Sequence, residues 1–173
     1  VVAKNDAAHS GLAAQLAGRS LTRAYKAVVW GVPSPRRGEI AGNIGRDPRN
    51  RKKMAVLARG GKPALTRYAV LQPLASAAAL IECRLATGRT HQIRVHLAAI
   101  GHPVIGDPVY AGNKQARLRP LKARAREAVE GLKRQALHAH RLGFTHPATA
   151  ERLEFDSELA RDIKPLIKNL EEI

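Results

Sequence analysis

The chain has 173 residues, 45% of them hydrophobic, which is typical of a single globular domain. It carries 30 Lys and Arg against 14 Asp and Glu, a formal net charge of +16, which indicates a polyanionic partner, RNA or DNA first. One cysteine excludes a disulfide framework and a zinc finger, and no apolar run approaches the roughly 20 residues of a membrane span.

Composition also indicates which kinds of binding surface and which compartment to expect. Six aromatic residues are too few for a broad base-stacking platform. Cys83 lies in an apolar run and is expected in the core. No signal-peptide pattern is visible, so the expected compartment is the cytoplasm. Binding to a membrane surface is disfavoured, because no segment predicts a helix that is strongly basic on one face and strongly apolar on the other.

The N-terminal third predicts a helix and two strands. Residues 1–3 have the composition of the end of a buried strand, so we expect the chain to be a domain cut inside an element. Asn5 and Asp6 predict the cap of a helix over residues 7–18, with Gly18 as its stop. Alternation predicts a strand over 21–31, and the turn at 33–38 leads into a returning strand from residue 39.

The middle of the chain predicts short strands around a basic loop and a helix. The loop, residues 46–53, holds five cations and precedes a short strand over 54–57. Two strands over 64–72 and 78–85 are expected to pair. A turn at 87–90 then leads into a short helix that ends at Ala99, with Thr90 as its expected cap.

The C-terminal third predicts a final strand pair and a helix. Residues 104–110 are expected as a strand and loop, and 114–134 as a basic loop that runs into a short helix. Strands over 136–144 and 152–155 are expected to pair, followed by a helix from a Ser157 cap through Leu170, with Pro165 as a weak point. The order indicates an α+β fold, a mixed and mainly antiparallel sheet with flanking helices, in one domain over 1–173.

Residues 85–96 are the densest stretch of candidate functional residues. A glycine turn precedes a helix N-terminus, which favours an anion, and Arg89 lies at that entrance. His91 and Arg94 share a helix face. Arg94 lies among apolar residues, so its guanidinium needs a partner. That partner is either a structural carboxylate such as Glu82, or a catalytic carboxylate or substrate phosphate.

Other candidates are weaker. Tyr25 lies on one strand face with Arg23, where it either packs in the sheet or stacks on a base. The basic loop is either a solvated charge run or a phosphate contact. His91 and His96 are five residues apart with no third ligand nearby, so no metal site is expected. His138 and His140 are expected at the surface or hydrogen-bonded in the core.

Several stretches together resemble the catalytic domain of the RluA-type ribosomal RNA pseudouridine synthases. Residues 85–110, LATGRTHQIRVHLAAIGHPVIGDPVY, are similar to a long motif of that family. RAYKAV at 23–28 resembles the motif of its active-site tyrosine, and QALHA at 135–139 resembles its C-terminal motif. The segments at 44–56 and 61–64 favour the branch that acts on large-subunit rRNA.

The resemblance implies an isomerase that needs no cofactor. A catalytic Asp cleaves the glycosidic bond of a uridine, the base turns, and C5 rejoins the ribose. Tyr25 matches the residue that packs on the base, Arg94 the partner of the catalytic Asp, and Leu137 an apolar contact to the base. We expect the RNA partner to be bound through Arg23, Arg46, Arg49, Arg51, Lys52, Lys53, Arg89 and His91.

One departure from the family is large. The family carries its catalytic Asp in an HRLDxxTSG-like motif, which is absent from this sequence, and Asp6, Asp47 and Asp107 do not occupy its place. We therefore assign no nucleophile and expect the chain to be an N-terminally truncated, inactive domain, monomeric and without metal. The alternative is a non-catalytic RNA-binding module that keeps the same fold.

Overall fold

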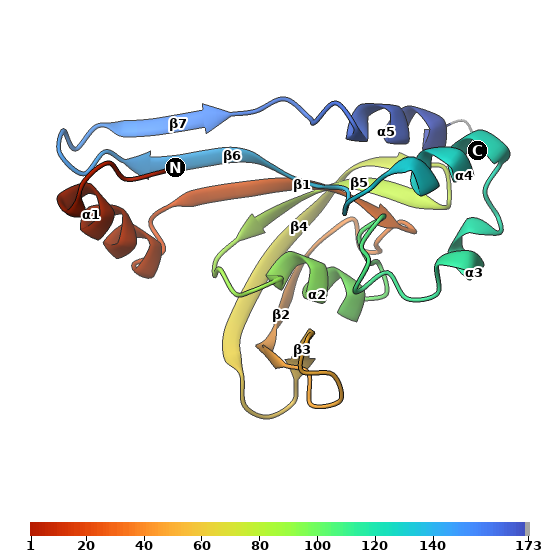
Figure 1. Cartoon of the computed structure of the whole chain (residues 1–173), viewed down its shortest axis with the longest axis horizontal. Helices are drawn as coiled ribbons and strands as arrows, with labels where there is room; N and C mark the ends of the chain where they lie inside the picture. The colour runs from red at the N-terminus through yellow and green to blue at the C-terminus, as the bar shows by residue number, and fades with distance from the viewer. Residues whose placement is uncertain (172–173) are drawn as a thin grey trace.

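The structure, a computed structural model, describes residues 1–171, which form five helices and seven strands (Figure 1). In chain order these are α1 (Asp6–Ala17), β1 (Thr22–Trp30), β2 (Arg37–Arg46), β3 (Met54–Leu57), β4 (Lys62–Leu74), β5 (Ala78–Leu85), α2 (Gln92–Ala99), α3 (Lys114–Leu118), α4 (Ala123–Gly131), β6 (Leu137–Thr145), β7 (Arg152–Asp156) and α5 (Ile163–Glu171).

All seven strands belong to one sheet in the order β3-β2-β4-β5-β1-β6-β7, and every ladder is antiparallel. The α+β prediction and both predicted strand pairs are confirmed. Although β2 follows β1 in the chain, it pairs with β3 and β4, because β5 and β6 occupy both edges of β1. Strand β1 therefore lies between two strands that are far from it in the sequence.

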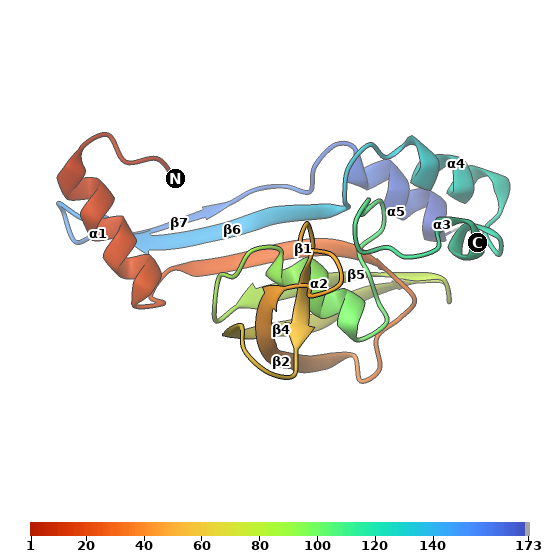
Figure 2. The same cartoon turned by 60° about the horizontal axis from the view of Figure 1, so that its bottom comes forward.

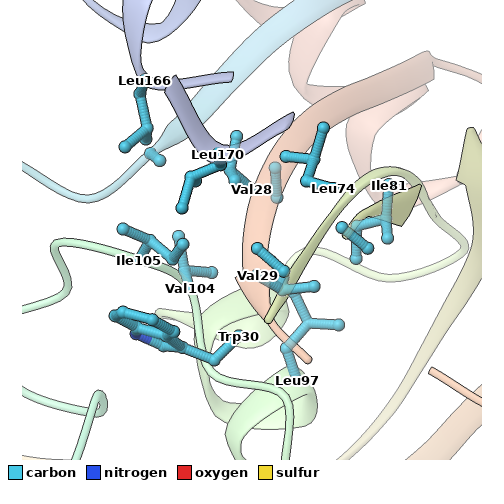
Figure 3. Packing of buried hydrophobic residues seen from close by; sticks show 14 of the residues in the cluster. Val28, Val29, Trp30, Leu74, Ile81, Leu97, Val104, Ile105, Leu166 and Leu170 are labelled. Carbon is cyan, nitrogen blue, oxygen red and sulfur yellow. The ribbon is translucent and has the colours of Figure 1, made fainter. Parts of the chain in front are cut away.

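The core covers both faces of β1. Successive side chains of a strand point to opposite faces, and Figure 3 shows Val28 toward Leu170 of α5 and Val29 toward Leu97 of α2. All four are buried, and each stabilises the fold by about 1.5–3 kcal/mol. Cys83 is also buried, as expected, and its burial together with Glu82 raises the pKa of the thiol to about 12.

The start of the chain departs from the prediction. Residues 1–3 form no strand and pair with none of the seven strands, and Val1 and Val2 are 66% and 89% exposed. Helix α1 is capped by Asn5, whose side chain accepts a hydrogen bond from the Ala8 amide at 2.8 Å. Gly18 ends the helix in a right-handed conformation, and Arg19 adopts the left-handed one, with a φ of 60°.

Three local predictions in the second half are wrong. The N-cap of α2 is His91, whose left-handed backbone turns the chain into the helix, and Thr90 does not cap it. Two helices, α3 and α4, replace the predicted loop and single short helix at 114–134. Helix α5 begins at Ile163 and not after Ser157, which places Pro165 in the first turn, where the missing amide costs no helical hydrogen bond.

The helices are spread along the sheet. Both views place α1 at one end, beside β6 and β7, and α4 and α5 at the other, while α2 lies near β2 and β4 (Figures 1 and 2). Within residues 1–171, no helix is long and apolar enough to cross a membrane. The same part of the chain contains no cluster of three or more His, Cys, Asp or Glu placed to hold a metal ion.

Candidate active site and RNA interface

A buried ion pair between Arg94 and Asp107 forms the centre of the site. Arg94, on α2, donates from Nε to Oδ2 of Asp107 at 2.7 Å and from Nη2 to Oδ1 at 2.8 Å. The Asp107 side chain is fully buried, and that of Arg94 is 12% exposed. Backbone amides of Val109 and Tyr110 also donate to Oδ1, so this tight turn orients the carboxylate toward α2.

The pair is fully ionised around neutral pH. Burial raises the pKa of Asp107, but the hydrogen bonds from Arg94 and from the two amides outweigh it, and the pKa lies below its ordinary value. The hydrogen bond to Asp107 raises the pKa of Arg94 in turn. Glu82, suggested by the sequence as a structural partner of Arg94, instead binds Arg84 at 2.7 Å and His140 at 3.1 Å. That suggestion is wrong, because Glu82 lies on β5 with other partners.

Tyr110 connects this ion pair to the basic loop. The Arg94 guanidinium lies 4.9 Å from the centre of the Tyr110 ring, a cation–π contact. The Tyr110 hydroxyl lies 3.0 Å from Nδ1 of His91 and accepts from the Met54 amide at 2.9 Å. Lys53 donates from Nζ to the Val109 carbonyl at 3.0 Å. The end of the basic loop is therefore attached to the turn that holds Asp107.

Sequence reasoning missed the roles of Asp107 and Tyr110. The sequence showed only that Asp107 does not occupy the place of the family's catalytic Asp, and it indicated no role for Tyr110. A signal was available, because a buried Arg at 94 requires a carboxylate, and Asp107 is the acidic residue that follows it most closely in the chain. Sequence spacing alone could not show that the turn folds back onto α2.

The turn before α2 is held by a buried polar network around Gln92. The Gln92 carbonyl oxygen accepts from the Thr87 hydroxyl at 2.7 Å and from the Arg89 amide at 3.0 Å. Its Nε2 donates to the Leu65 carbonyl and to the Thr66 hydroxyl, both at 3.0 Å. All four hydrogen-bonding positions of this amide are used. Gln92 therefore connects the turn that contains Thr87 and Arg89 to strand β4.

Tyr25 and Leu137 lie together on the sheet. Tyr25 is half-buried on β1 opposite Cys83, and Leu137 of β6 lies opposite Ala27, two residues farther along β1 and so on the same face. Both pack against the core. The three proposed catalytic positions come from three different elements: Arg94 from α2, Tyr25 from β1 and Leu137 from β6.

The predicted RNA-binding residues fall into two groups. Arg49, Arg51 and Lys52 are exposed on the basic loop, which is shaped by hydrogen bonds from the Arg49 amide to Asp47 and from the Lys52 amide to Asn50. Arg46 is also exposed, and its Nη1 donates to the Arg51 carbonyl at 3.1 Å. Lys53 lies apart from these four, because its ammonium group is bound to Val109.

The second group surrounds the turn before α2. Arg89 is half-buried and donates from Nε to the Pro63 carbonyl at 3.2 Å. Arg23 reaches the same turn from β1: a Cβ added at Gly88 would lie 2.6 Å from Nη1 of Arg23. The pKa of His91 is lowered, by desolvation and by nearby Arg94, so this side chain adds no charge at neutral pH.

The three other histidines considered in the sequence, His96, His138 and His140, lie in the sheet or against it. His96 is fully buried, with Nδ1 2.9 Å from the Thr66 hydroxyl, and desolvation lowers its pKa. His140 pairs with Glu82, as noted above. His138 is half-buried, and its Nε2 makes no hydrogen bond within the described chain, contrary to the expectation of a surface or hydrogen-bonded residue.

Comparison with known proteins places these features in a family. Residues 1–99 match the family described as RNA pseudouridylate synthase. The chain is 48% identical over 171 residues to a ribosomal large subunit pseudouridine synthase D of Zymomonas mobilis, an alignment that covers 98% of this chain and 51% of the relative. It is 45% identical to an uncharacterized RNA pseudouridine synthase of Bacillus subtilis, covering 98% of this chain and 51% of the relative.

A solved structure shows the same fold. Human RNA Pseudouridylate Synthase Domain Containing 1 superposes with a TM-score of 0.71 at 27% identity, covering 99% of this chain and 74% of that one. The chain spans about half the length of the curated relatives that it matches.

Proposed function

Because the chain belongs to the RNA pseudouridylate synthase family, we propose that it is the part of a synthase domain that isomerises uridine to pseudouridine in large-subunit ribosomal RNA. Two relatives that are 48% identical carry the name ribosomal large subunit pseudouridine synthase D, which supports this substrate class. In the reaction, the bond between C1′ and N1 breaks, a bond between C1′ and C5 forms, and the C5 proton is lost while N1 gains one. The reaction is an isomerisation, so it needs no co-reactant.

Arg94 carries the proposal. Its Nε and Nη2 are bound to Asp107, which fixes the plane of the guanidinium, while Nη1 makes no hydrogen bond within residues 1–171. A guanidinium held in this way presents a donor to a second carboxylate, and it favours the ionised, nucleophilic form of that group. Asp107 cannot be that nucleophile, because its side chain has no exposed surface and already accepts four hydrogen bonds.

Tyr25 and Leu137 are proposed to contact the base. A nucleotide taken out of its stack needs an aromatic or apolar surface to replace the stacking that it loses. Their common face on β1 and β6 supplies an aromatic ring and an aliphatic side chain, both packed against the core and therefore rigid. We assign Tyr25 and Leu137 to positioning of the base, and Arg94 to binding of the nucleophilic carboxylate.

The proposal extends to the partner, the oligomeric state and the compartment of the chain. The net charge of +16 fits an RNA partner, and we propose that the chain acts as a monomer in the cytoplasm, where ribosomal RNA is present. The 173 residues contain no match to the family's nucleophile motif, so we propose that this chain alone binds RNA without turnover.

The test compares two proteins: the chain itself, and the chain extended by the aligned upstream segment of the Zymomonas mobilis relative. Pseudouridine is detected by carbodiimide labelling in rRNA from a synthase-deficient strain. We expect product only from the extended protein, and we expect Arg94→Gln to abolish it while RNA affinity changes by less than a few-fold. Arg67→Gln, at an exposed ion pair on β4, is the control.

Two results would contradict the proposal. Near-normal turnover by Arg94→Gln would remove Arg94 from the reaction. A folded, extended protein that binds rRNA but makes no pseudouridine would instead favour the non-catalytic RNA-binding module.

A further inference from the structure

Three arginines surround a small depression between the end of α1 and the turn before α2. Its volume is about 300 Å³, and it is lined by Leu16, Ala17, Arg19, Arg23, Thr87, Gly88 and Arg89. No carboxylate lines it among the described residues. The volume is at the lower end of the range for ligand pockets, and it leaves room for one phosphodiester group.

The arginine heads are available to an anion. Within residues 1–171, the guanidinium groups of Arg19 and Arg23 form no ion pair, and that of Arg89 forms one hydrogen bond, from Nε to a carbonyl. The Nε of Arg23 is buried and has no partner. A half-buried cation without a counter-ion is costly unless a ligand supplies the negative charge. Of the three arginines, Arg23 therefore gives the strongest indication of a bound anion, because its buried Nε has no partner within residues 1–171.

Local backbone geometry places these groups. Arg19 has a φ of 60°, so it turns the chain between α1 and β1 in a conformation that non-glycine residues rarely adopt. At Gly88 the missing side chain leaves the space that Nη1 of Arg23 occupies, since a Cβ there would lie 2.6 Å from this atom. Arg89 follows directly, in the turn fixed by Gln92.

A second basic depression lies across the same turn. It has a volume of about 500 Å³, shares Gly88 and Arg89 with the first, and adds Arg46 and Lys62. No aromatic residue and no carboxylate lines either depression among the described residues. Two cationic hollows on either side of one turn match the repeated charge of a nucleic-acid backbone, and neither offers a surface for stacking a base.

We propose that Arg19, Arg23 and Arg89 form a subsite for one phosphodiester of the RNA backbone, next to a second phosphate position at Arg46 and Lys62. Guanidinium groups bind phosphate through paired, charge-assisted hydrogen bonds. The inference rests on the proposed RNA substrate, and it deepens that proposal by naming where the backbone crosses the protein.

The test measures binding of the 173-residue chain to a large-subunit rRNA transcript at several salt concentrations. Arg19→Gln combined with Arg23→Gln should weaken binding about tenfold at low salt and reduce the log–log salt slope by about 0.7 to 0.9, the value for one phosphate. The control, Arg161→Gln with Lys168→Gln, makes the same charge change at exposed positions beside and on α5.

Gly88→Ala tests the geometry without a change of charge. The added methyl must displace the Arg23 head, so this variant should weaken binding by itself and have little further effect in the Arg23→Gln background. Additive effects of the two substitutions would overturn the joint role of Gly88 and Arg23. Unfolding curves of each variant would show whether a loss of binding reflects a loss of fold.

The outcomes separate this subsite from the proposed function. If the wild-type chain does not bind rRNA, both fail. If it binds, but the double variant matches the control in affinity and slope, the subsite is wrong and the proposed function stands. If inorganic phosphate shifts the arginine NMR signals of the wild type, yet the double variant binds rRNA normally, the site takes a free anion and the RNA assignment is overturned.

Discussion

Burial sets the Arg94–Asp107 pair apart from the exposed ion pairs of the molecule. Arg141 and Asp156 also form two hydrogen bonds, but their side chains are 41% and 55% exposed. Water and salt weaken an exposed pair, whereas a buried charge that loses its partner has no solvent to replace it. At the residue scale, two Arg–Asp pairs with the same hydrogen bonds thus contribute differently to stability, because one is buried and the other is exposed.

Asp107→Asn should therefore destabilise the fold. The amide keeps the shape of the carboxylate but leaves the Arg94 guanidinium with little compensation, at a cost of about 3 kcal/mol in the free energy of unfolding. Urea denaturation monitored by circular dichroism measures it. Asp156→Asn is the matched control and should change stability little. Equal losses from the two variants would contradict the special role of burial.

His96 should make stability depend on pH. Its pKa in the folded state is lowered from 6.5 by desolvation, so the unfolded chain takes up a proton first as the pH falls. The stability from neutral, buried His96 is present above about pH 6.5 and lost as the pH falls below it, with a slope of at most about 1.4 kcal/mol per pH unit.

The measurement is urea unfolding between pH 7.5 and 5.5, in which His96→Asn should reduce the slope. His91 and His140, whose pKa values are also lowered, contribute in the same direction and remain in the variant. An unchanged slope in His96→Asn would show that His96 is not the group that titrates.

At the scale of elements, the basic loop is a rigid attachment to the site and not a free segment. Its end is fixed by the bonds from Lys53 to Val109 and from Met54 to Tyr110, and β3 then pairs with β2. Arg49, Arg51 and Lys52 are left exposed on it. The loop can thus hold phosphates at a defined position relative to Arg94, while Lys53 serves as an anchor.

Replacing Arg49, Arg51 and Lys52 with Ala should weaken RNA binding and flatten its salt dependence. If each cation neutralises one phosphate, the log–log slope falls by roughly two to three units. Filter binding to an rRNA transcript at several salt concentrations measures it. A control triple variant, Lys133, Arg161 and Lys168 to Ala, removes the same charge elsewhere. Unchanged affinity and slope would remove the loop from the binding surface.

At the scale of the whole molecule, stability is concentrated away from α1. One core cluster joins β1, β4 and β5 to α2 and α5, whereas α1 buries no residue. Gln15 joins this helix to β6: its amide nitrogen donates to the Thr145 carbonyl at 2.6 Å, and its amide oxygen accepts from the Thr145 amide at 2.8 Å. Elements with few buried contacts open at a lower free energy than the core.

Amide hydrogen exchange should show this division. Amides of β1, β4 and β5 should exchange last and together, and those of α1 much earlier. Gln15→Ala should speed exchange in α1 alone, because the two bonds to Thr145 are lost while the core is unchanged. Gln115→Ala, at an exposed position of α3, is the control. Equal protection of α1 and the central strands would contradict this picture.

The sequence by itself determined the fold class and most elements. Alternation in β1, the paired runs of β4 and β5, and the Asn5 cap of α1 depend on neighbours in the chain, so local patterns predicted them. The excess of cations and the motif at residues 85–110 also predicted an RNA pseudouridine synthase, in agreement with the family comparison. The N-cap at His91 and the start of α5 were missed, because Thr90 and Ser157 are favourable capping residues by type but do not cap these helices in the structure.

Only the tertiary structure decided the partners. Local patterns cannot place Asp107 against Arg94, Lys53 against Val109, or Arg23 beside Gly88, because each of these pairs is 13 to 65 residues apart and is brought together by chain folding. A charged side chain takes its role from the burial and counter-charge that surround it. The sequence therefore identified which cations the chain has, and the fold determined which of them anchor the structure and which are free to bind an anion.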